Sequence, residues 1–422
     1  MKKFKSLKMR THMLIIFSVT IVLFYGIAFL CASPQEILNG FKEIVRARDV
    51  LITDYFVVGG YGAAFFNSAL VMTISLIIIL VLKMDFTGLT AASLMIMGGF
   101  AFFGKQPFNI LPIILGTIIY AKTQGQKASR YIHVGFLASG VAPIITEINY
   151  LLDCGEVWNI IIATLVGIVI GYVIVPLSAH TVGVHLGYNI FNVGFAAGIL
   201  ALCVMTVLSM LGFKSETILI WKNGVPDWLL AVMICYFTFL FLYGLVLSNF
   251  KIKPAMKIMR HPGRAVADFI LMDGLAPTLI NMSVVGMIAL VYILLIGGDL
   301  SGPVVGAILT VCGFGAFGMH PKNYFPVLLG VFIASMVGIY EPTTPGLQLA
   351  AIFSGALAPI AGQFGTLAGM LAGFLHSAIV VNTGALYSGM NLYNNGFSAG
   401  FVAIVMVPLI ESFMKRYNTE EE

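Results

Sequence analysis

The sequence predicts an all-α polytopic integral membrane protein, with about 14 membrane-embedded helical segments arranged as two inverted-topology repeats. Three observations predict this class: the apolar composition, the length of the apolar runs, and a repeat that extends along the chain. Glycine, proline and asparagine recur within the apolar runs, so some helices are expected to be broken or re-entrant.

The composition is that of a chain surrounded by lipid. Of the 422 residues, 59% are hydrophobic and 10% are charged, whereas a soluble domain carries about 25% charged residues. Several runs approach the roughly 20 apolar residues that a helix needs to cross a bilayer, and they lack the alternation of a β-barrel. These runs are residues 13–30, 69–82, 158–176 and 228–248.

A shift of 214 positions superposes one part of the chain on another. Residues 98–116 and 312–330 then agree at nine of nineteen positions, with Gly, Pro and Asn at the same places. This self-similarity predicts a first repeat at residues 1–212, a linker at 213–227 and a second repeat at 228–422. The basic N-terminus and its apolar run are interpreted as a retained helix, because cleavage would remove a span that the second repeat keeps.

Each half contains about seven apolar segments, and an odd number places equivalent positions on opposite sides of a membrane. In the first half they lie near 12–32, 58–83, 89–104, 107–122, 133–150, 157–177 and 182–211. In the second half they lie near 228–249, 270–297, 302–318, 323–340, 347–361, 364–382 and 385–413.

The charge distribution agrees with inversion. Residues 35–54 are of mixed charge and are expected outside, whereas their counterparts, 251–268, are almost purely basic and are expected inside. Lys105, Lys214 and Lys222 go against this pattern. Both termini are therefore expected in the cytoplasm, and the protein in the inner (plasma) membrane of a bacterial cell.

The segments FGKQPFNILP and FGMHPKNYFP interrupt the two halves at equivalent places. Their Gly and Pro residues prevent an uninterrupted helix. One interpretation is a loop between two short spans, whose charged residue reaches the headgroups. The other is a re-entrant hairpin that lines a cavity, in which Asn109 and Asn323 contact the substrate. The gate would then comprise Lys105, His320, Pro107 and Pro321.

The segments GYNIFNVGFAAG and GMNLYNNGFSAG close the two halves. Asn189 and Asn192 are three residues apart, as are Asn391 and Asn394, so each pair shares a face if the segment is helical. The glycines favour a discontinuous helix or a hairpin, whose free ends and amides would bind an ion or polar solute together with the nearby His185. The alternative is close helix packing with interhelical amide bonds.

Ionisable residues inside apolar segments are candidates for ion coupling. Glu147 is the main candidate, with Gln363 as its counterpart in the second half; a position near the headgroups is the alternative. Asp54 and Asp268 begin equivalent spans and are interpreted as interfacial anchors or helix caps. The histidines and cysteines are scattered, so neither a metal site nor a cofactor is expected.

The paired FGKQPFNILP and FGMHPKNYFP segments, with NxxNxGFxAG closing each half, carry a family resemblance. The chain resembles an uncharacterised family of bacterial polytopic membrane proteins that is catalogued as a domain of unknown function. The resemblance extends over essentially the whole chain. It implies a duplicated membrane architecture and no particular substrate.

These patterns predict a secondary transporter for a small polar or anionic solute, with H⁺ or Na⁺ as the possible coupling ion and lipid as a partner. A second copy of the chain is a candidate partner; nucleic acid is not, because the positive charges lie in short loops. No motif of a soluble catalytic domain is present, and an enzyme is not expected. The alternatives are a passive channel for a neutral solute, an intramembrane enzyme acting on a lipid-linked substrate through His185 or Lys105, and a scaffold for another membrane protein.

Overall fold

The structure is a computed structural model that describes residues 7–50 and 52–420. Within these residues the chain is helical apart from two short parallel strands, β1 (Ile52–Thr53) and β2 (Leu219–Ile220). Nine helices of the described part are long and apolar enough to cross a membrane. The predicted class, an all-α polytopic membrane protein, is confirmed, while the count of 14 membrane-embedded segments stays a prediction.

The elements follow the same order in both halves. The first half contains α2 (Met9–Cys31), α3 (Pro34–Arg46), α4 (Tyr55–Val58), α5 (Gly60–Val81), α6 (Gly88–Phe100), α7 (Pro107–Thr123), η1 (Ala128–Arg130), α8 (Ile132–Ala138), η2 (Ser139–Val141), α9 (Pro143–Leu151), α10 (Glu156–Val184) and α11 (Asn192–Met210). The second half contains α12 (Asp227–Leu247), α13 (Lys253–Ile258), α14 (Phe269–Met272), α15 (Leu275–Leu295), α16 (Gly302–Phe314), α17 (Pro321–Val337), α18 (Pro345–Phe353), η3 (Ser354–Leu357), α19 (Ala358–Phe364), α20 (Thr366–Thr383), η4 (Gly384–Tyr387) and α21 (Asn394–Glu420).

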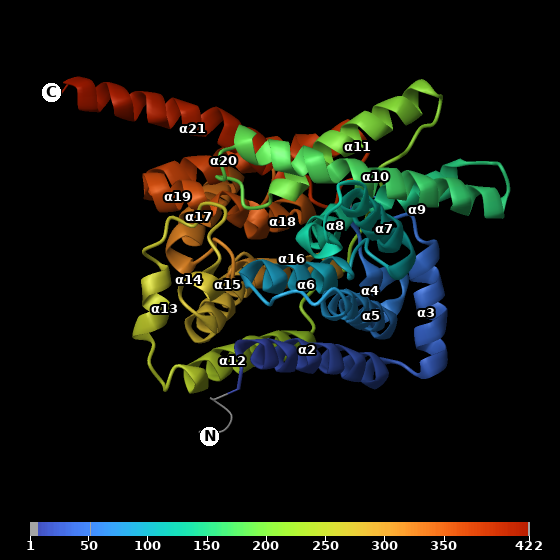
Figure 1. Cartoon of the computed structure of the whole chain (residues 1–422), viewed down its shortest axis with the longest axis horizontal. Coiled ribbons are helices and arrows are strands. Elements are labelled where there is room, and N and C mark those ends of the chain that lie inside the picture. The colour runs from blue at the N-terminus through green and yellow to red at the C-terminus, as the bar shows by residue number, and fades with distance from the viewer. Residues whose placement is uncertain (1–6, 51, 421–422) are drawn as a thin grey trace.

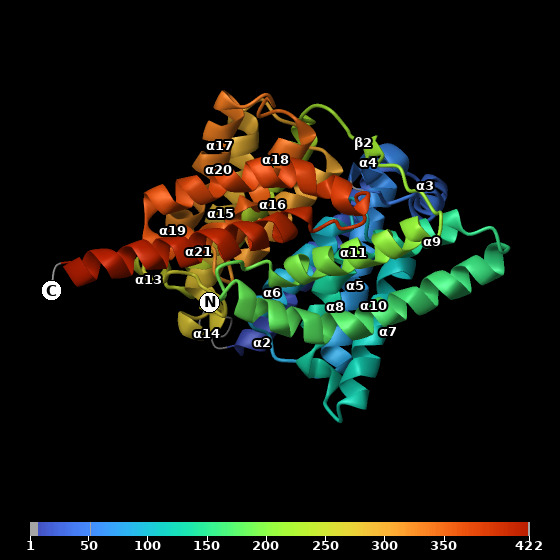
Figure 2. The ribbon, with the colours of Figure 1, turned by 90° about the horizontal axis from the view of Figure 1, so that it is seen from above.

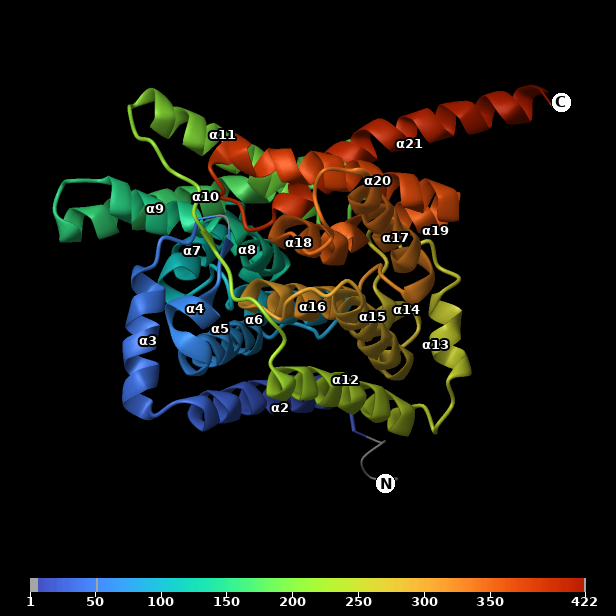
Figure 3. The same cartoon turned by 180° about the vertical axis from the view of Figure 1, so that it is seen from behind.

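Equivalent helices of the two halves lie together in layers (Figure 1). Helices α2 and α12 form one face, α6 and α16 lie in the middle, and the α10–α11 and α20–α21 pairs form the opposite face. Seen from above, α11 and α21 meet over the centre of the molecule (Figure 2). The view from behind shows α3 and α13 at opposite ends of the longest dimension (Figure 3).

Helices α2 and α12 run antiparallel to each other. His12 Nδ1 lies 2.9 Å from the Tyr243 hydroxyl, whereas Thr20 Oγ1 lies 3.2 Å from the Tyr236 hydroxyl. Residue numbers therefore increase along one helix in the direction in which they decrease along the other. These polar contacts fix the register of two helices whose other side chains are mostly apolar.

The central pair, α6 and α16, packs backbone against backbone. A Cβ atom on Gly99 would lie 2.4 Å from the Gly306 carbonyl oxygen, and one on Gly313 would lie 3.1 Å from Ala92 Cα. Small residues are what allow helices to approach this closely in an apolar environment. Every residue of both helices except the half-buried Leu89 is buried, so this pair forms the centre of the core.

Each half supplies a helix cap to the other half. Asp54 Oδ1 accepts hydrogen bonds from its neighbour Phe56 N and from Gly302 N, the first residue of α16, at 3.1 Å. Asp268 Oδ1 accepts a hydrogen bond from Gly88 N, the first residue of α6, at 2.8 Å. The interpretation of both aspartates as caps is confirmed, and the caps also join the halves.

Helix α10 differs from the sequence expectation at its C-terminal end. The apolar segment was expected at 157–177, but the helix continues through Pro176 and ends at Val184. A proline inside a membrane helix is tolerated because neighbouring groups satisfy the freed carbonyl. The break between apolar helices therefore falls at residues 185–191.

Candidate functional site

A small cavity lies at the junction of the two halves. Its volume is about 290 Å³, at the lower limit of ligand pockets, and corresponds to roughly ten water molecules at about 30 Å³ each. The first half contributes Ile52 and Phe103 to its lining, and the linker contributes Thr217. The second half contributes the other lining residues, mainly from α18, α20 and the start of α21.

The polar part of the lining consists of amides and a hydroxyl. The amides belong to Asn391, Asn394 and Asn395, and the hydroxyl belongs to Thr217. None of the described residues that line this cavity has an ionisable side chain. The lining therefore suits a small solute with hydrogen-bonding groups, since amides both donate and accept.

Asn394, the first residue of α21, ties that helix to α20. Its Oδ1 accepts hydrogen bonds from Thr383 Oγ1, at 2.7 Å, and from the Tyr387 hydroxyl. Its Nδ2 donates to the Val380 carbonyl at 3.0 Å. The side chain is therefore satisfied within the protein and holds one wall of the cavity in place.

Asn192 makes the equivalent contacts in the first half, with a histidine in place of the tyrosine. Its Oδ1 accepts a hydrogen bond from Thr181 Oγ1 and lies 2.8 Å from His185 Nε2, and its Nδ2 donates to the Ser178 carbonyl at 2.8 Å. Asn192 and His185 do not belong to the lining of the 290 Å³ cavity. Their contacts fit the packing alternative better than direct solute binding.

Asn189 and Asn391 connect the halves to each other. Asn189 Nδ2 donates to the Gly396 carbonyl at 2.9 Å, and Asn391 Nδ2 donates to the Gly194 carbonyl at 3.4 Å. At these glycines α11 and α21 touch, because a Cβ atom on Gly194 would lie 3.2 Å from Gly396 Cα. Of these two asparagines, Asn391 also lines the cavity.

The expected helix face shared by Asn189 and Asn192 is not formed. Asn189 lies in a turn, where its Oδ1 accepts a hydrogen bond from Phe191 N, and only Asn192 lies in α11. Asn391 and Asn394 are separated in the same way. Gly187 has a φ of +79°, a conformation that ends helices and favours glycine.

The two proline motifs are buried turns that begin α7 and α17. Gln106 and His320 are the N-caps, and Asn109 and Asn323 complete capping boxes three residues later. Asn109 Nδ2 donates to the Gly104 carbonyl, and Asn323 Nδ2 donates to the Gly318 carbonyl, both at 2.9 Å. The predicted gate prolines, Pro107 and Pro321, each occupy the first position of the helix.

Lys105 is buried inside the protein. Its side chain is 0% exposed, with Nζ 3.1 Å from the Phe136 carbonyl and 5.3 Å from the Tyr393 ring centre. It forms no ion pair with any residue in the described part of the chain. The turn is therefore enclosed by protein on the side that carries Lys105, and it also brings Phe103 to the cavity.

Glu147 is paired with an arginine that the sequence did not single out. Its carboxylate accepts hydrogen bonds from Arg48 Nε at 3.0 Å and Nη2 at 2.6 Å, and from Ser215 Oγ at 2.7 Å. Glu147 is 1% exposed, so its carboxylate is enclosed by protein. Gln363, its expected counterpart, is exposed and has no matching environment.

Asp49, which the sequence interpretation also missed, is a buried carboxylate with neutral partners. It is 1% exposed; Tyr55 Oη donates to its Oδ1 at 2.6 Å, and Asn109 Nδ2 donates to its Oδ2 at 3.2 Å. Burial raises the pKa of Asp49 to about 8. In the sequence, this buried carboxylate is indicated by the adjacent charged residues Arg48 and Asp49, which lie shortly before a buried span.

The equivalent region of the second half has different ionisable groups. Gly263 occupies the position that corresponds to Asp49, and Asn323 Nδ2 donates to the Pro262 carbonyl instead, at 3.4 Å. His261 Nε2 lies 3.0 Å from Asp273 Oδ2, and its carbonyl lies 2.9 Å from His320 Nε2. The repeat preserved the turn and its capping amide but not the carboxylate.

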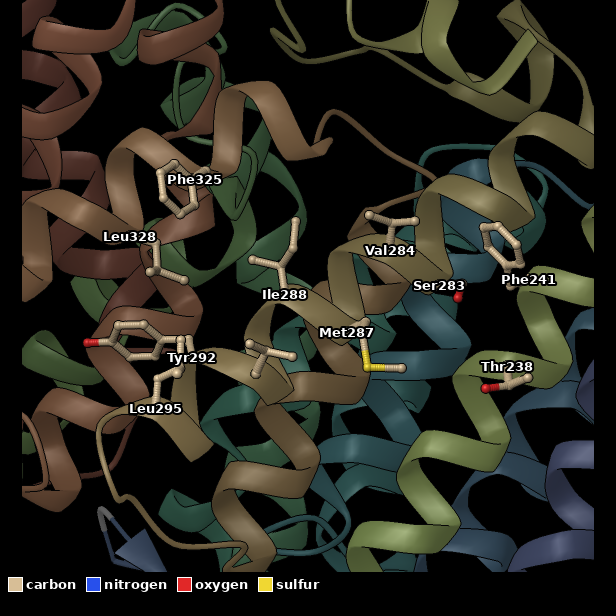
Figure 4. Close-up of a pocket in the computed structure, with 11 residues that line it drawn as sticks. Thr238, Phe241, Ser283, Val284, Met287, Ile288, Tyr292, Leu295, Phe325 and Leu328 are labelled. Carbon is tan, nitrogen blue, oxygen red and sulfur yellow. The ribbon is translucent and has the colours of Figure 1, made fainter. Parts of the chain in front are cut away.

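An apolar groove of about 470 Å³ lies between α12, α15 and α17 (Figure 4). Met287, Ile288 and Phe325 are among its lining residues, and the Ser283 hydroxyl at its edge donates to the Phe237 carbonyl at 2.7 Å. A groove with so few free polar groups suits a hydrocarbon chain rather than a polar solute. The groove is therefore a poor fit for a polar solute.

Comparison with known families agrees with this duplicated arrangement. The family model described as protein of unknown function (DUF1576) matches the chain twice, at residues 33–210 and 247–412. Neither the search of curated proteins nor the search of solved structures found a match. The two matched regions fall one in each half and together cover most of the sequence. The chain therefore belongs to the DUF1576 family, in a duplicated form.

Proposed function

We propose that the protein is a secondary transporter that moves a small polar solute through the cavity at the junction of its two halves. The observation that carries the proposal is the amide-lined cavity between two duplicated units of a multi-pass membrane protein. Transporters built from repeats bind their solutes where the repeats meet, next to interrupted helices. The chain breaks at 185–191 and 388–393 are interruptions of this kind.

The proposal includes an inverted orientation of the two halves. The antiparallel α2 and α12, and the placement of α3 and α13 at opposite ends, support an axis of pseudo-symmetry in the membrane plane. The nine long helices, the bent α8–α9 pair and the four shorter apolar helices would then make up the 14 membrane-embedded segments. The inner membrane, with cytoplasmic termini, is part of the same proposal.

The lining favours an uncharged polar solute over an anion. The three asparagines and Thr217 are uncharged, and no lining residue in the described part of the chain carries a charge. Both amide atoms of Asn391 and Asn394 already bond to the protein. An anion would depend on backbone N–H groups at the start of α21 for its compensation. The volume of about 290 Å³ limits the solute to the size of a small metabolite.

Uptake into proteoliposomes tests the transport proposal. The purified protein is first screened by thermal shift against small neutral and anionic metabolites, and the radiolabelled hits are then offered to proteoliposomes. We expect saturable uptake of an uncharged polar compound. An Ala385→Trp variant should abolish uptake, because Ala385 is exposed at the cavity and a large side chain would fill the opening.

The control is Ala179→Trp, which places the same side chain on an exposed position of α10. Uptake that survives Ala385→Trp, or fails equally in both variants, would contradict the site. Accumulation against a gradient identifies a carrier. Equilibration without accumulation identifies the passive channel, which an uncharged lining also favours.

A further inference from the structure

The carboxylate of Asp49 lies next to the cavity wall but outside the cavity. Asp49 is three residues before Ile52, which lines the cavity, and Asn109 links it to the Gly104 carbonyl, beside the lining residue Phe103. A change of charge at Asp49 would therefore act on two of the cavity residues of the first half through short, direct connections.

The groups around Asp49 leave its charge uncompensated. Its carboxylate is reached by the Tyr55 hydroxyl, the Thr146 hydroxyl and the Asn109 amide, all neutral. The guanidinium of the neighbouring Arg48 makes a two-point contact with Glu147. The centre of the Tyr150 ring lies 4.2 Å from the same guanidinium.

Two adjacent carboxylates thus have opposite environments. Glu147 is paired with the Arg48 guanidinium, whereas Asp49 is buried with neutral hydrogen-bond donors alone. A buried carboxyl without a cation is the one that exchanges a proton in response to small changes of its surroundings. Glu147, the candidate expected from the sequence, is the poorer choice for this role.

We infer that Asp49 is the proton-binding site of the protein and that H⁺ is the ion coupled to solute movement. The inference rests on the proposed transport function and deepens it. Asp49 holds the proton in the state described here and releases it when water reaches the carboxylate. The pKa of about 8 supports this, because the proton is bound at neutral pH and is released at moderate alkalinity.

The site is present in one half only. The position equivalent to Asp49 is Gly263, and the amide of Asn323 contacts a backbone carbonyl there. The two halves of the duplicated protein therefore differ in the proton-binding group that they place at this turn.

Infrared spectroscopy tests the site without any solute. The full-length protein in nanodiscs is titrated from pH 5 to pH 10 while the C=O band of protonated carboxyl groups is recorded. We expect a band that disappears with a midpoint near pH 8 and is missing in Asp49→Asn. It should persist in Asp153→Asn, which removes an exposed carboxylate. A titration that is the same in the wild type and Asp49→Asn would overturn the inference.

Tyr55→Phe provides a second variant that conserves shape. Loss of the Tyr55 hydroxyl removes a hydrogen bond that lowers the pKa of Asp49, so the midpoint of the carboxyl titration should move to higher pH. A purely structural tyrosine would leave the midpoint unchanged, and an unchanged midpoint would count against the site. Asp49→Asn mimics the protonated residue, and its folding is checked by size-exclusion chromatography.

A transport experiment distinguishes the proton-binding role of Asp49 from the proposed transport function. With an imposed pH gradient, wild-type proteoliposomes should accumulate the solute found above, and Asp49→Asn should exchange it without accumulation. Accumulation by Asp49→Asn would overturn the coupling role. An absence of any solute movement in the wild type would refute the proposed function, while the infrared titration would still decide whether Asp49 binds the proton.

Discussion

At the scale of single residues, the buried asparagines mainly satisfy backbone groups that helices leave free. Asn67 Nδ2 donates to the Ala101 and Lys105 carbonyls at 2.7 and 2.8 Å, and Asn281 repeats this in the second half. In lipid an unpaired carbonyl costs several kcal/mol. The partners of Asn67 and Asn281 lie more than thirty residues away in the sequence, so a local pattern could not predict this role.

Asp49 should make stability depend on pH. Its pKa is raised from 3.8 to about 8 in the folded protein, so the unfolded chain loses the proton first as pH rises. Stability contributed by this residue should therefore fall between about pH 4 and pH 8, by at most about 1.4 kcal/mol per pH unit, and then level off. Thermal unfolding across this range measures the slope.

The isosteric variant Asp49→Asn is the control for the change of stability with pH. It cannot ionise, so its melting temperature should change less with pH over the same range than that of the wild type. Identical pH profiles for the two proteins would show that Asp49 is not buried in the way described here.

Loss of Arg48 and loss of Glu147 should lower the stability of the protein by different amounts. The arginine side chain is 20% exposed and the glutamate 1%. Arg48→Met leaves a buried carboxylate with only Ser215 as donor, at a cost of about 3–5 kcal/mol. Glu147→Gln leaves a guanidinium that reaches water and stacks on Tyr150, so its cost should be smaller.

Chemical unfolding of both single variants and of the double variant measures these costs. The double variant should be more stable than Arg48→Met, because the unpaired buried charge is gone. Equal losses from the two single changes, or additive losses in the double variant, would contradict the pairing.

At the scale of helices and turns, the interruptions of the apolar segments are ordered structures inside the protein. The turns at 101–106 and 315–320 are closed by capping boxes, so backbone groups that would face lipid are satisfied. Gly and Pro indicated these breaks from the sequence, because both residues act on the chain locally. The burial of Lys105 could not be predicted, since it depends on α8 and Tyr393 from other segments.

The crossing of α11 and α21 should depend on its glycines. A Cβ atom on Gly396 would lie 3.0 Å from Gly194 Cα, so alanine at either position forces the helices apart. We expect Gly194→Ala and Gly396→Ala each to lower stability by about 1–3 kcal/mol, as overpacking does. Thermal unfolding in detergent measures the effect.

Gly26→Ala is the matched control for this prediction. Gly26 lies within α2, and a Cβ atom there would meet nothing within 4 Å. Alanine should be neutral or stabilising by up to about 1 kcal/mol, because it favours the helix. A loss at Gly26 as large as the loss at Gly194 would show that the close approach is not the cause.

At the scale of the whole molecule, the halves are joined by reciprocal contacts. Ile190 N donates to the Ala356 carbonyl at 3.0 Å, and the equivalent Leu392 N donates to the Gly140 carbonyl at 2.8 Å. Together with the exchanged caps of Asp54 and Asp268, these bonds couple a movement in one half to the other. The repeat predicted two related units, but single-sequence reasoning could not predict which residues of one unit contact the other.

The inverted orientation makes a prediction about the two sides of the membrane. Helices α3 and α13 are equivalent and lie at opposite ends of the molecule, and Lys42 and Lys257 on them are exposed. In a background without the five native cysteines, Lys42→Cys should react with a membrane-impermeant maleimide in intact cells. Lys257→Cys should react only after the cells are permeabilised, because the basic segment is expected in the cytoplasm. A protein whose two cysteines are labelled from the same side would have parallel halves, and this result would contradict the proposed inverted orientation.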